Sequence, residues 1–261
     1  MEGKNMEHSH EEVKAALWEK SQQSEVIKRL KSGEGLQVIM DSLEKIQEAF
    51  TDLDVIVCSD GRVLPSDGAK LGIAGEGILL GEEDLKRLVE NCKGKIKKVT
   101  SHEDCGAAGV AFRGDSKGKN KPDELGIEFA QILAEKLGAE YEHLPMSKMK
   151  NTIHNERFIC FDGTGRFNPE ALKEMPGQFV CSGYAFGLGE DYLEIEIATL
   201  AGIALGDHGF GKKFTKDNKF MIIVSAKDDA QLAEMTKIAE EAIEKYGELV
   251  EVRGFVHNEE A

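Results

Sequence analysis

The chain has 261 residues, 41% of them hydrophobic, and carries a formal net charge of −15 at pH 7. That apolar content is enough for one large core or two smaller ones, so we expect a folded protein and not a disordered one. The excess of carboxylates repels phosphate backbones, and no basic stripe is present, which disfavours nucleic-acid binding and favours a small-molecule substrate.

No apolar run reaches the roughly 18 residues that a membrane span requires, and the charged start of the chain has no apolar signal core. These features predict a cytoplasmic protein without a membrane segment. Cysteines at positions 58, 92, 105, 160 and 181 make an odd number in a chain without an export signal. A disulfide framework is therefore not expected, and metal-binding or catalytic cysteines are.

The predicted elements begin with an N-terminal helical arm, within residues 1–35, that ends at glycines. Hydrophobic periodicity and glycine-rich interruptions then define the elements of the first half of the chain. We predict helices over residues 11–32, 36–50, 82–91 and 123–137, and strands over residues 53–57 and 96–100. This alternation predicts an α/β fold with a parallel-rich sheet covered by helices.

The second half of the chain, from about residue 151, resembles a second copy of the first. Residues 57–65 match 159–169, residues 75–85 match 183–193, and residues 96–105 match 221–229. Three matches in the same order predict two related lobes, residues 36–150 and 151–261. In the last match, Ala226 and Asp229 stand where the first lobe has His102 and Cys105, so the second lobe lacks the full ligand set described next.

Three side chains of the first lobe form a candidate zinc site. Cys58 follows the first predicted strand, and His102 and Cys105 follow the second. Because the carboxyl ends of parallel strands meet at one edge of a sheet, these donors can converge there. Two cysteinates and an imidazole suit zinc, and an open fourth position would make the metal catalytic. Asp60 and Arg62 share the segment of Cys58 and can form a charge-assisted pair beside the metal.

The sequences CSDGR at residues 58–62 and HEDCG at residues 102–106 resemble the Cys-x-Asp-x-Arg and His-x-x-Cys-Gly signatures of the β-class carbonic anhydrases. The resemblance covers about residues 36–140, including a glycine-containing loop at 73–77. It implies that Cys58, His102 and Cys105 bind Zn²⁺. In that family, metal-bound water is deprotonated and the resulting hydroxide converts carbon dioxide reversibly to bicarbonate.

The resemblance also implies roles for residues beside the metal. Asp60 would either accept a hydrogen bond from the zinc hydroxide while Arg62 holds it, or occupy the fourth zinc position and close the site. Backbone N–H groups around Gly106 would help to fix the substrate. Active sites of the family lie near an interface between equivalent subunits, so the second lobe is expected to act as a pseudo-subunit, and a homodimer is a further expectation.

Three alternatives remain open. Relatives with the same ligands hydrolyse carbon disulfide or carbonyl sulfide, and Gly61 replaces the serine that the family usually has at this position, which leaves the substrate open. The zinc could be structural or regulatory, with Asp60 as its permanent fourth ligand. The stretch from Cys160 to Arg166 resembles the Cys-x5-Arg loop of cysteine-dependent phosphatases, although Ile159 stands where those enzymes usually have histidine. No recognisable ligand spacing surrounds His143, His154, His208 or His257.

Overall fold

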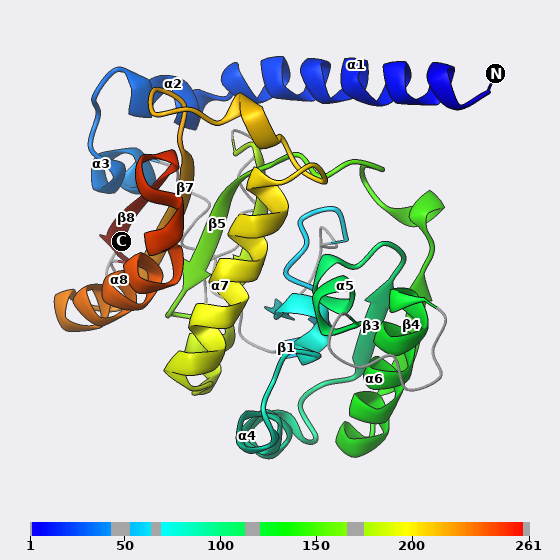
Figure 1. The fold of residues 1–261 in the computed structure, drawn as a ribbon. Coiled ribbons are helices and arrows are strands. Elements are labelled where there is room, and N and C mark those ends of the chain that lie inside the picture. Colours follow the sequence, from blue (N-terminus) through cyan, green and yellow to red (C-terminus); the bar gives the residue numbers. More distant parts are fainter. Residues whose placement is uncertain (1, 43–52, 64–68, 113–120, 166–174, 258–261) are drawn as a thin grey trace.

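A computed structural model describes residues 2–42, 53–63, 69–112, 121–165 and 175–257. These residues contain two four-stranded sheets with the orders β2-β1-β3-β4 and β6-β5-β7-β8. All strand pairs in both sheets are parallel. Helices flank the sheets (Figure 1), so the fold is α/β with parallel sheets, as the sequence predicts.

The first sheet consists of β1 (Leu53–Val57), β2 (Ala69–Gly72), β3 (Lys98–His102) and β4 (Glu140–Leu144). Its connections contain α4 (Glu82–Cys92), α5 (Gly106–Phe112), α6 (Pro122–Leu137) and the 3-10 helix η2 (Ala74–Gly77), and the 3-10 helix η3 (Met146–Lys148) follows β4. Proline near the start and Gly138, in the left-handed conformation at φ +70°, define the two ends of α6. Its apolar face covers β3 and β4.

The second sheet consists of β5 (Glu156–Asp162), β6 (Gly177–Cys181), β7 (Phe220–Ala226) and β8 (Val250–Val256). It is accompanied by α7 (Glu190–Leu205), α8 (Asp229–Ile243), η5 (Gly183–Phe186), η6 (Gly211–Lys213) and η7 (Glu244–Leu249). Before both sheets come α1 (Glu2–Gln22), α2 (Glu25–Lys31) and α3 (Leu36–Asp41). Ser24 caps α2, because its hydroxyl accepts the N–H of Ile27 at 3.2 Å.

Most predicted elements agree with the structure to within a few residues. The helical arm differs, because Gln23 and Ser24 separate α1 from α2. The helix expected at 36–50 is described only as α3, and residues 43–52 lie outside the described part of the chain. His102 is the last residue of β3 and not a loop residue after it. The sequence patterns did not predict β2 and α5, which are short and rich in small residues.

Alternating side chains of β5 face two different apolar clusters. Ile159 and Phe161 belong to a cluster that also contains residues of the first sheet, α4, α6, α7 and α8, which we call the shared core. Phe158 and Cys160 point the other way, towards the apolar residues of α2 and α3. This two-residue period is that of a strand covered on both faces. The N-terminal helices thus cover one face of the second sheet, while the shared core joins the two lobes.

The lobes also meet through backbone contacts near β2 and β6. The N–H of Val180 donates to the carbonyl of Ser59 at 2.9 Å, and the N–H of Ser182 donates to the carbonyl of Gly72 at 2.9 Å. Gly61 lies so close that a Cβ added there would be 2.1 Å from the carbonyl oxygen of Gln178. Only a residue without a side chain allows this approach of the two backbones.

We therefore expect Gly61→Ala to destabilise the protein by about 2 kcal/mol, since the added methyl group must push the lobes apart. Urea denaturation measures this change. Gly109→Ala is the matched control, because Gly109 is helical and nothing lies within 4 Å of its added Cβ; it should be neutral or slightly stabilising. Equal effects of the two substitutions would show that the lobes do not meet at Gly61.

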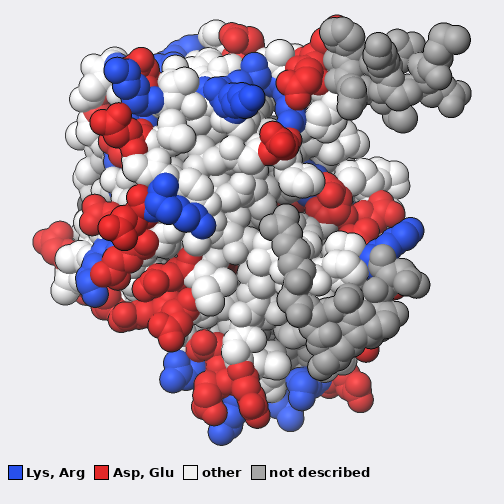
Figure 2. All heavy atoms as spheres, in the orientation of Figure 1, with Lys and Arg blue, Asp and Glu red and all other residues white. Residues whose placement is uncertain are grey.

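Carboxylates dominate part of the surface. Figure 2 shows them gathered over α8, whose sequence includes Asp229, Glu234, Glu240 and Glu241. Among the described residues, no helix combines the length and the apolar character needed to cross a membrane.

Three expectations stay predictions: the boundaries of the lobes, their common origin and the homodimer.

Candidate metal centre

The three predicted ligands converge in the structure. Ligand atoms of Cys58, His102 and Cys105 all lie within 4.8 Å of one another, and the three residues are 3%, 2% and 6% exposed. Cys58 directly follows β1, and His102 ends the neighbouring strand β3. The chain leaves β1 for β2 on one side and returns to β3 on the other, so the group lies at a topological switch point of the sheet.

His102 has the hydrogen bond that a metal ligand needs. Its Nδ1 lies 2.8 Å from the carbonyl oxygen of Glu103, which can only accept, so Nδ1 carries the proton. The other ring nitrogen, Nε2, is buried and has no hydrogen-bond partner among the described residues. A buried imidazole nitrogen without a partner, facing two thiols, fits a metal ligand whose tautomer is fixed by its second nitrogen.

Burial and mutual interactions shift the pKa values of the ligand group. The hydrogen bond with Cys105 and burial raise the pKa of the Cys58 thiol well above its ordinary value. Burial alone would lower the pKa of His102, but Cys58 and then Asp60 raise it to about 10. Metal binding would displace these protons, because thiolate and neutral imidazole are the forms that ligate.

The glycine-containing loop approaches both sulfur atoms. Gly75 donates its N–H to Sγ of Cys58 at 3.2 Å and adopts the left-handed conformation with φ +54°. A Cβ at this position would lie 2.8 Å from Cγ2 of Ile78, 3.0 Å from Cβ of Ala107 and 3.5 Å from Sγ of Cys105. Both the conformation and the space therefore require glycine, and its N–H stabilises negative charge on the sulfur.

Asp60 and Arg62 form the predicted pair. Nε of Arg62 donates to Oδ2 of Asp60 at 2.9 Å, Nη2 donates to the same oxygen at 2.7 Å, and both side chains are buried. Burial alone would raise the pKa of Asp60, but attraction to His154, Arg62 and His102 outweighs it and holds that pKa below its ordinary value. Oδ2 lies 3.9 Å from Nε2 of His102, so an ionised carboxylate stands beside the ligand group.

Arg62 also fixes the second motif. Its Nη1 donates to Oδ2 of Asp104 at 3.2 Å, and its Nη2 donates to the Asp104 carbonyl oxygen at 3.2 Å. Asp104 lies between His102 and Cys105 and has φ +57°, a conformation that folds the turn back on itself. One guanidinium therefore ties the segment of Cys58 to the turn that presents Cys105.

Sequence reasoning missed His154 and Glu156. Nε2 of His154 lies 3.9 Å from Oδ2 of Asp60, and its Nδ1 lies 3.1 Å from Oε2 of Glu156. Asp60, His154 and Glu156 form a second buried group that could hold a metal. The cationic Arg62, bound to both oxygens of Asp60, disfavours a cation there. The signal in the sequence is His-x-Glu at the start of a strand, which places both side chains on one side.

Glu76 was missed as well. It is 1% exposed, adopts φ +56°, and its Oε1 has no hydrogen-bond partner among the described residues. Burial and then the nearby Cys58 raise its pKa well above the ordinary value. The left-handed backbone conformation costs free energy at a residue other than glycine, so it marks a position that the surrounding structure constrains.

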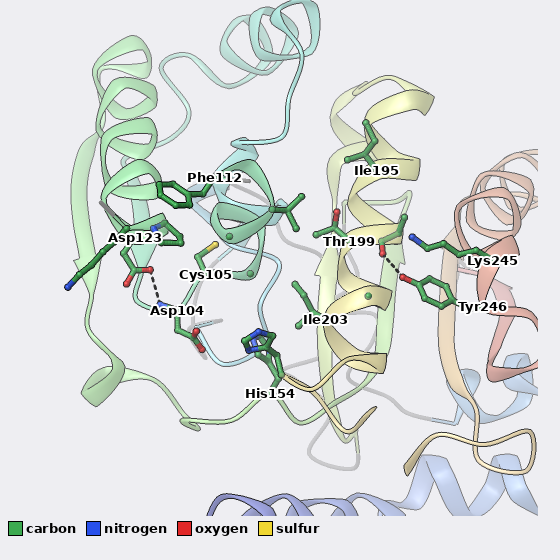
Figure 3. A pocket seen from close by; sticks show the side chains of 18 residues that line it. Asp104, Cys105, Phe112, Asp123, His154, Ile195, Thr199, Ile203, Lys245 and Tyr246 are labelled. Atoms are coloured by element: carbon green, nitrogen blue, oxygen red, sulfur yellow. Dashed lines mark hydrogen bonds between the residues drawn. The ribbon is translucent and has the colours of Figure 1, made fainter. Parts of the chain in front are cut away.

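A pocket of about 900 Å³ between the lobes reaches the ligand group. Its lining includes Cys105, Gly106, His154, Ile195, Thr199 and Ile203. Figure 3 shows Cys105 and His154 on one side, facing side chains of α7 on the other. A Cβ at Gly106 would lie 2.3 Å from Cδ1 of Ile203, so glycine allows α5 to pack against α7. His208 also lines this pocket.

The remaining cysteines lie elsewhere. Cys92, Cys160 and Cys181 are buried with no exposed surface, and none belongs to a ligand group found among the described residues. Cys160 lies inside the buried strand β5. In a cysteine-dependent phosphatase, the thiol would lie in an accessible loop after the strand. Arg166, its proposed partner, is outside the described residues. The phosphatase alternative therefore gains no support from this arrangement.

Comparisons of the chain with protein-family models, curated proteins and solved structures found no match. No family is assigned. The function must therefore be inferred from the chemistry of the site and from the two short motifs that place its residues.

Proposed function

We propose that this chain is a zinc enzyme, a carbonate dehydratase, that hydrates carbon dioxide reversibly to bicarbonate. The observation that carries the proposal is the donor set of Cys58, His102 and Cys105 at the end of a pocket, with the Asp60–Arg62 pair beside it. Two thiols and one imidazole fit zinc, and the buried Nε2 of His102 fits a nitrogen ligand. Zinc held there would lower the pKa of a coordinated water towards about 7 and so supply hydroxide at neutral pH.

The protein's own residues orient the reaction. Arg62 helps to keep Asp60 ionised, and a carboxylate can only accept a hydrogen bond. Asp60 therefore selects a nucleophile that bears a hydroxyl group, and it fixes the direction in which the lone pairs of that nucleophile point. His154 lies 3.9 Å from Asp60 through its Nε2 and also lines the pocket, so this nitrogen can exchange a proton with a group bound there. Its Nδ1 is fixed by Glu156, which keeps the ring in one orientation.

The pocket supports a small uncharged substrate. More of its lining surface is apolar than polar, with Val110, Phe112, Ile195 and Ile203 contributing. Carbon dioxide is apolar and needs only a small part of about 900 Å³. The same lining suits carbonyl sulfide and carbon disulfide, and these triatomic analogues are our second candidate substrates on the same ligand group.

A purely structural zinc explains less. Structural sites usually close with a fourth cysteine or histidine, and no such residue joins the ligand group among the described residues. Oδ2 of Asp60 lies 3.9 Å from Nε2 of His102, and both oxygens of this carboxylate already accept hydrogen bonds from Arg62. A pocket that leads to Cys105 is also unnecessary for a structural ion.

The test combines zinc content with stopped-flow carbon dioxide hydration on wild type and Asp60→Asn. We expect about one zinc ion per chain in both proteins and hydration reduced by on the order of 100-fold in the variant, because the amide no longer orients the nucleophile. Asp229→Asn, at an exposed site on α8, is the control and should hydrate normally. Zinc without hydration at any pH would overturn the assignment and direct the search to the sulfur analogues.

A further inference from the structure

Glu196 connects the second lobe to the back of the metal centre. It lies on α7, has no exposed surface, and its Oε1 accepts hydrogen bonds from the hydroxyl of Ser59 at 2.8 Å and from the N–H of Ala74 at 2.6 Å. Ser59 and Ala74 both belong to the first lobe. One carboxylate oxygen of the second lobe therefore binds two separate segments of the first lobe.

Both segments position the same ligand. Ser59 directly follows Cys58, and Ala74 directly precedes Gly75, whose N–H donates to Sγ of Cys58 at 3.2 Å. Glu196 thus holds the backbone that carries the Cys58 thiol and the backbone that donates to it. Removing this acceptor would take one hydrogen bond from each segment, and the buried N–H of Ala74 would lose its partner.

Burying a carboxyl group costs free energy, and the packing of α7 does not require a carboxyl group at this position. The pKa of Glu196 is raised to about 7 by burial, against which the hydrogen bonds from Ser59 and Ala74 act. Its Oε2 has no hydrogen-bond partner among the described residues. An apolar residue would be expected at such a helix position if packing against the first lobe were its only role.

A backbone contact acts on the same segment from the same side. The N–H of Val180, on β6, donates to the carbonyl of Ser59 at 2.9 Å. Ser59 is therefore held at its main chain and at its side chain, both times by the second lobe. Residues next to a metal ligand that are fixed in this way set the direction of the ligand.

We propose that Glu196 is a positioning residue through which the second lobe sets the geometry of the Cys58 thiol, so that metal affinity in the first lobe depends on the second. This inference rests on the metal site of the proposed function and is independent of the substrate. It gives the lobe that lacks the ligands a role in the site.

The experiment compares Glu196→Gln with Glu196→Leu in the full chain. Zinc dissociation constants come from competition with a chromophoric chelator, and the cobalt-substituted proteins report thiolate ligation through their charge-transfer absorption. Glutamine keeps one acceptor oxygen, so affinity and spectrum should stay close to wild type. Leucine removes it, and we expect zinc to bind 10- to 100-fold more weakly, roughly the range for groups that support metal ligands, with an altered cobalt spectrum.

Leu200→Ala separates positioning from general destabilisation. Leu200 is buried one turn further along α7 and belongs to the shared core, and its apolar side chain can make no hydrogen bond to Ser59 or Ala74. This variant should lose thermal stability with zinc affinity and cobalt spectrum unchanged. If Glu196→Leu weakens zinc binding no more than Leu200→Ala does, the inference is overturned. A wild-type protein that binds no zinc would instead overturn the proposed function, whereas zinc binding without hydration leaves this comparison decisive.

Discussion

Cys58→Ser will reduce the zinc content of the purified protein from about one ion per chain to almost none, and carbon dioxide hydration will disappear with it. Serine is a poor zinc ligand, because its hydroxyl stays protonated at neutral pH whereas a thiol near a cation ionises. Among the described residues, three strong donors lie within 4.8 Å of one another at this site, so the loss of one leaves too few to hold the ion. Metal analysis of dialysed protein measures the change.

Thermal denaturation gives a second readout of the same substitution. A ligand present at 1,000 times its dissociation constant stabilises the folded state by about 4 kcal/mol. A chelator should therefore lower the melting temperature of wild type and leave that of Cys58→Ser unchanged. Cys92→Ser is the control, because Cys92 is also buried, at the end of α4, and belongs to neither of the ligand groups found in the described part of the chain. The zinc assignment fails if Cys58→Ser keeps its full metal content or if Cys92→Ser loses it.

Arg62→Met will destabilise the metal-free protein by about 3–5 kcal/mol, which is the usual cost of leaving one partner of a buried ion pair uncompensated. Asp60 is 2% exposed and receives three side-chain hydrogen bonds from Arg62. The same guanidinium binds Asp104 in the second motif. Urea denaturation in the presence of a chelator measures the loss without a contribution from zinc.

Two comparisons identify the cause. Asp60→Asn removes the charge that Arg62 compensates, so the double variant should be more stable than Arg62→Met alone. The pH dependence shows whether ionised Asp60 raises or lowers the stability of each protein. In wild type the pKa of Asp60 is lowered, so its contribution is complete above about pH 4 and is lost as the pH falls through the folded pKa. Without Arg62, only His154 and His102 would oppose the effect of burial, so the pKa of Asp60 would be lowered less and the variant would gain less stability than wild type as the pH rises. The stability gap between the two proteins should therefore widen as the pH rises from the acid range to about pH 7, and a constant gap would contradict this explanation.

Sequence patterns predict the parts of the fold that are set by residues close together in the sequence. The strand 53–57 and the helices near 82–91 and 123–137 follow from periodicity and from terminal signals such as Pro122 and Gly138. The three ligands follow from their places beside strand ends. In contrast, β2 has only four residues, and α5 is seven residues of mostly small side chains, so neither gives a periodic signal.

Side chains that reach the site from the other half of the chain could not be predicted. Glu196 lies 137 residues after its partner Ser59, and His154 approaches Asp60 only because β5 begins beside the first lobe. In sequence, Glu196 is one acidic residue in a helix that contains several. Its importance depends on which face of α7 meets which loop, and that is decided by packing between distant segments. Cys160 is a different case, because the stretch that resembles a phosphatase loop begins inside the buried strand β5.

The shared core has a consequence for how the molecule unfolds. Because its apolar residues come from both sheets, separating the lobes would expose them in each half. The two lobes should then melt in a single transition, and neither should be recoverable as a folded fragment. Mutations in the second lobe, far from the candidate metal site, would then lower the amount of folded protein, as mutations at the site itself would.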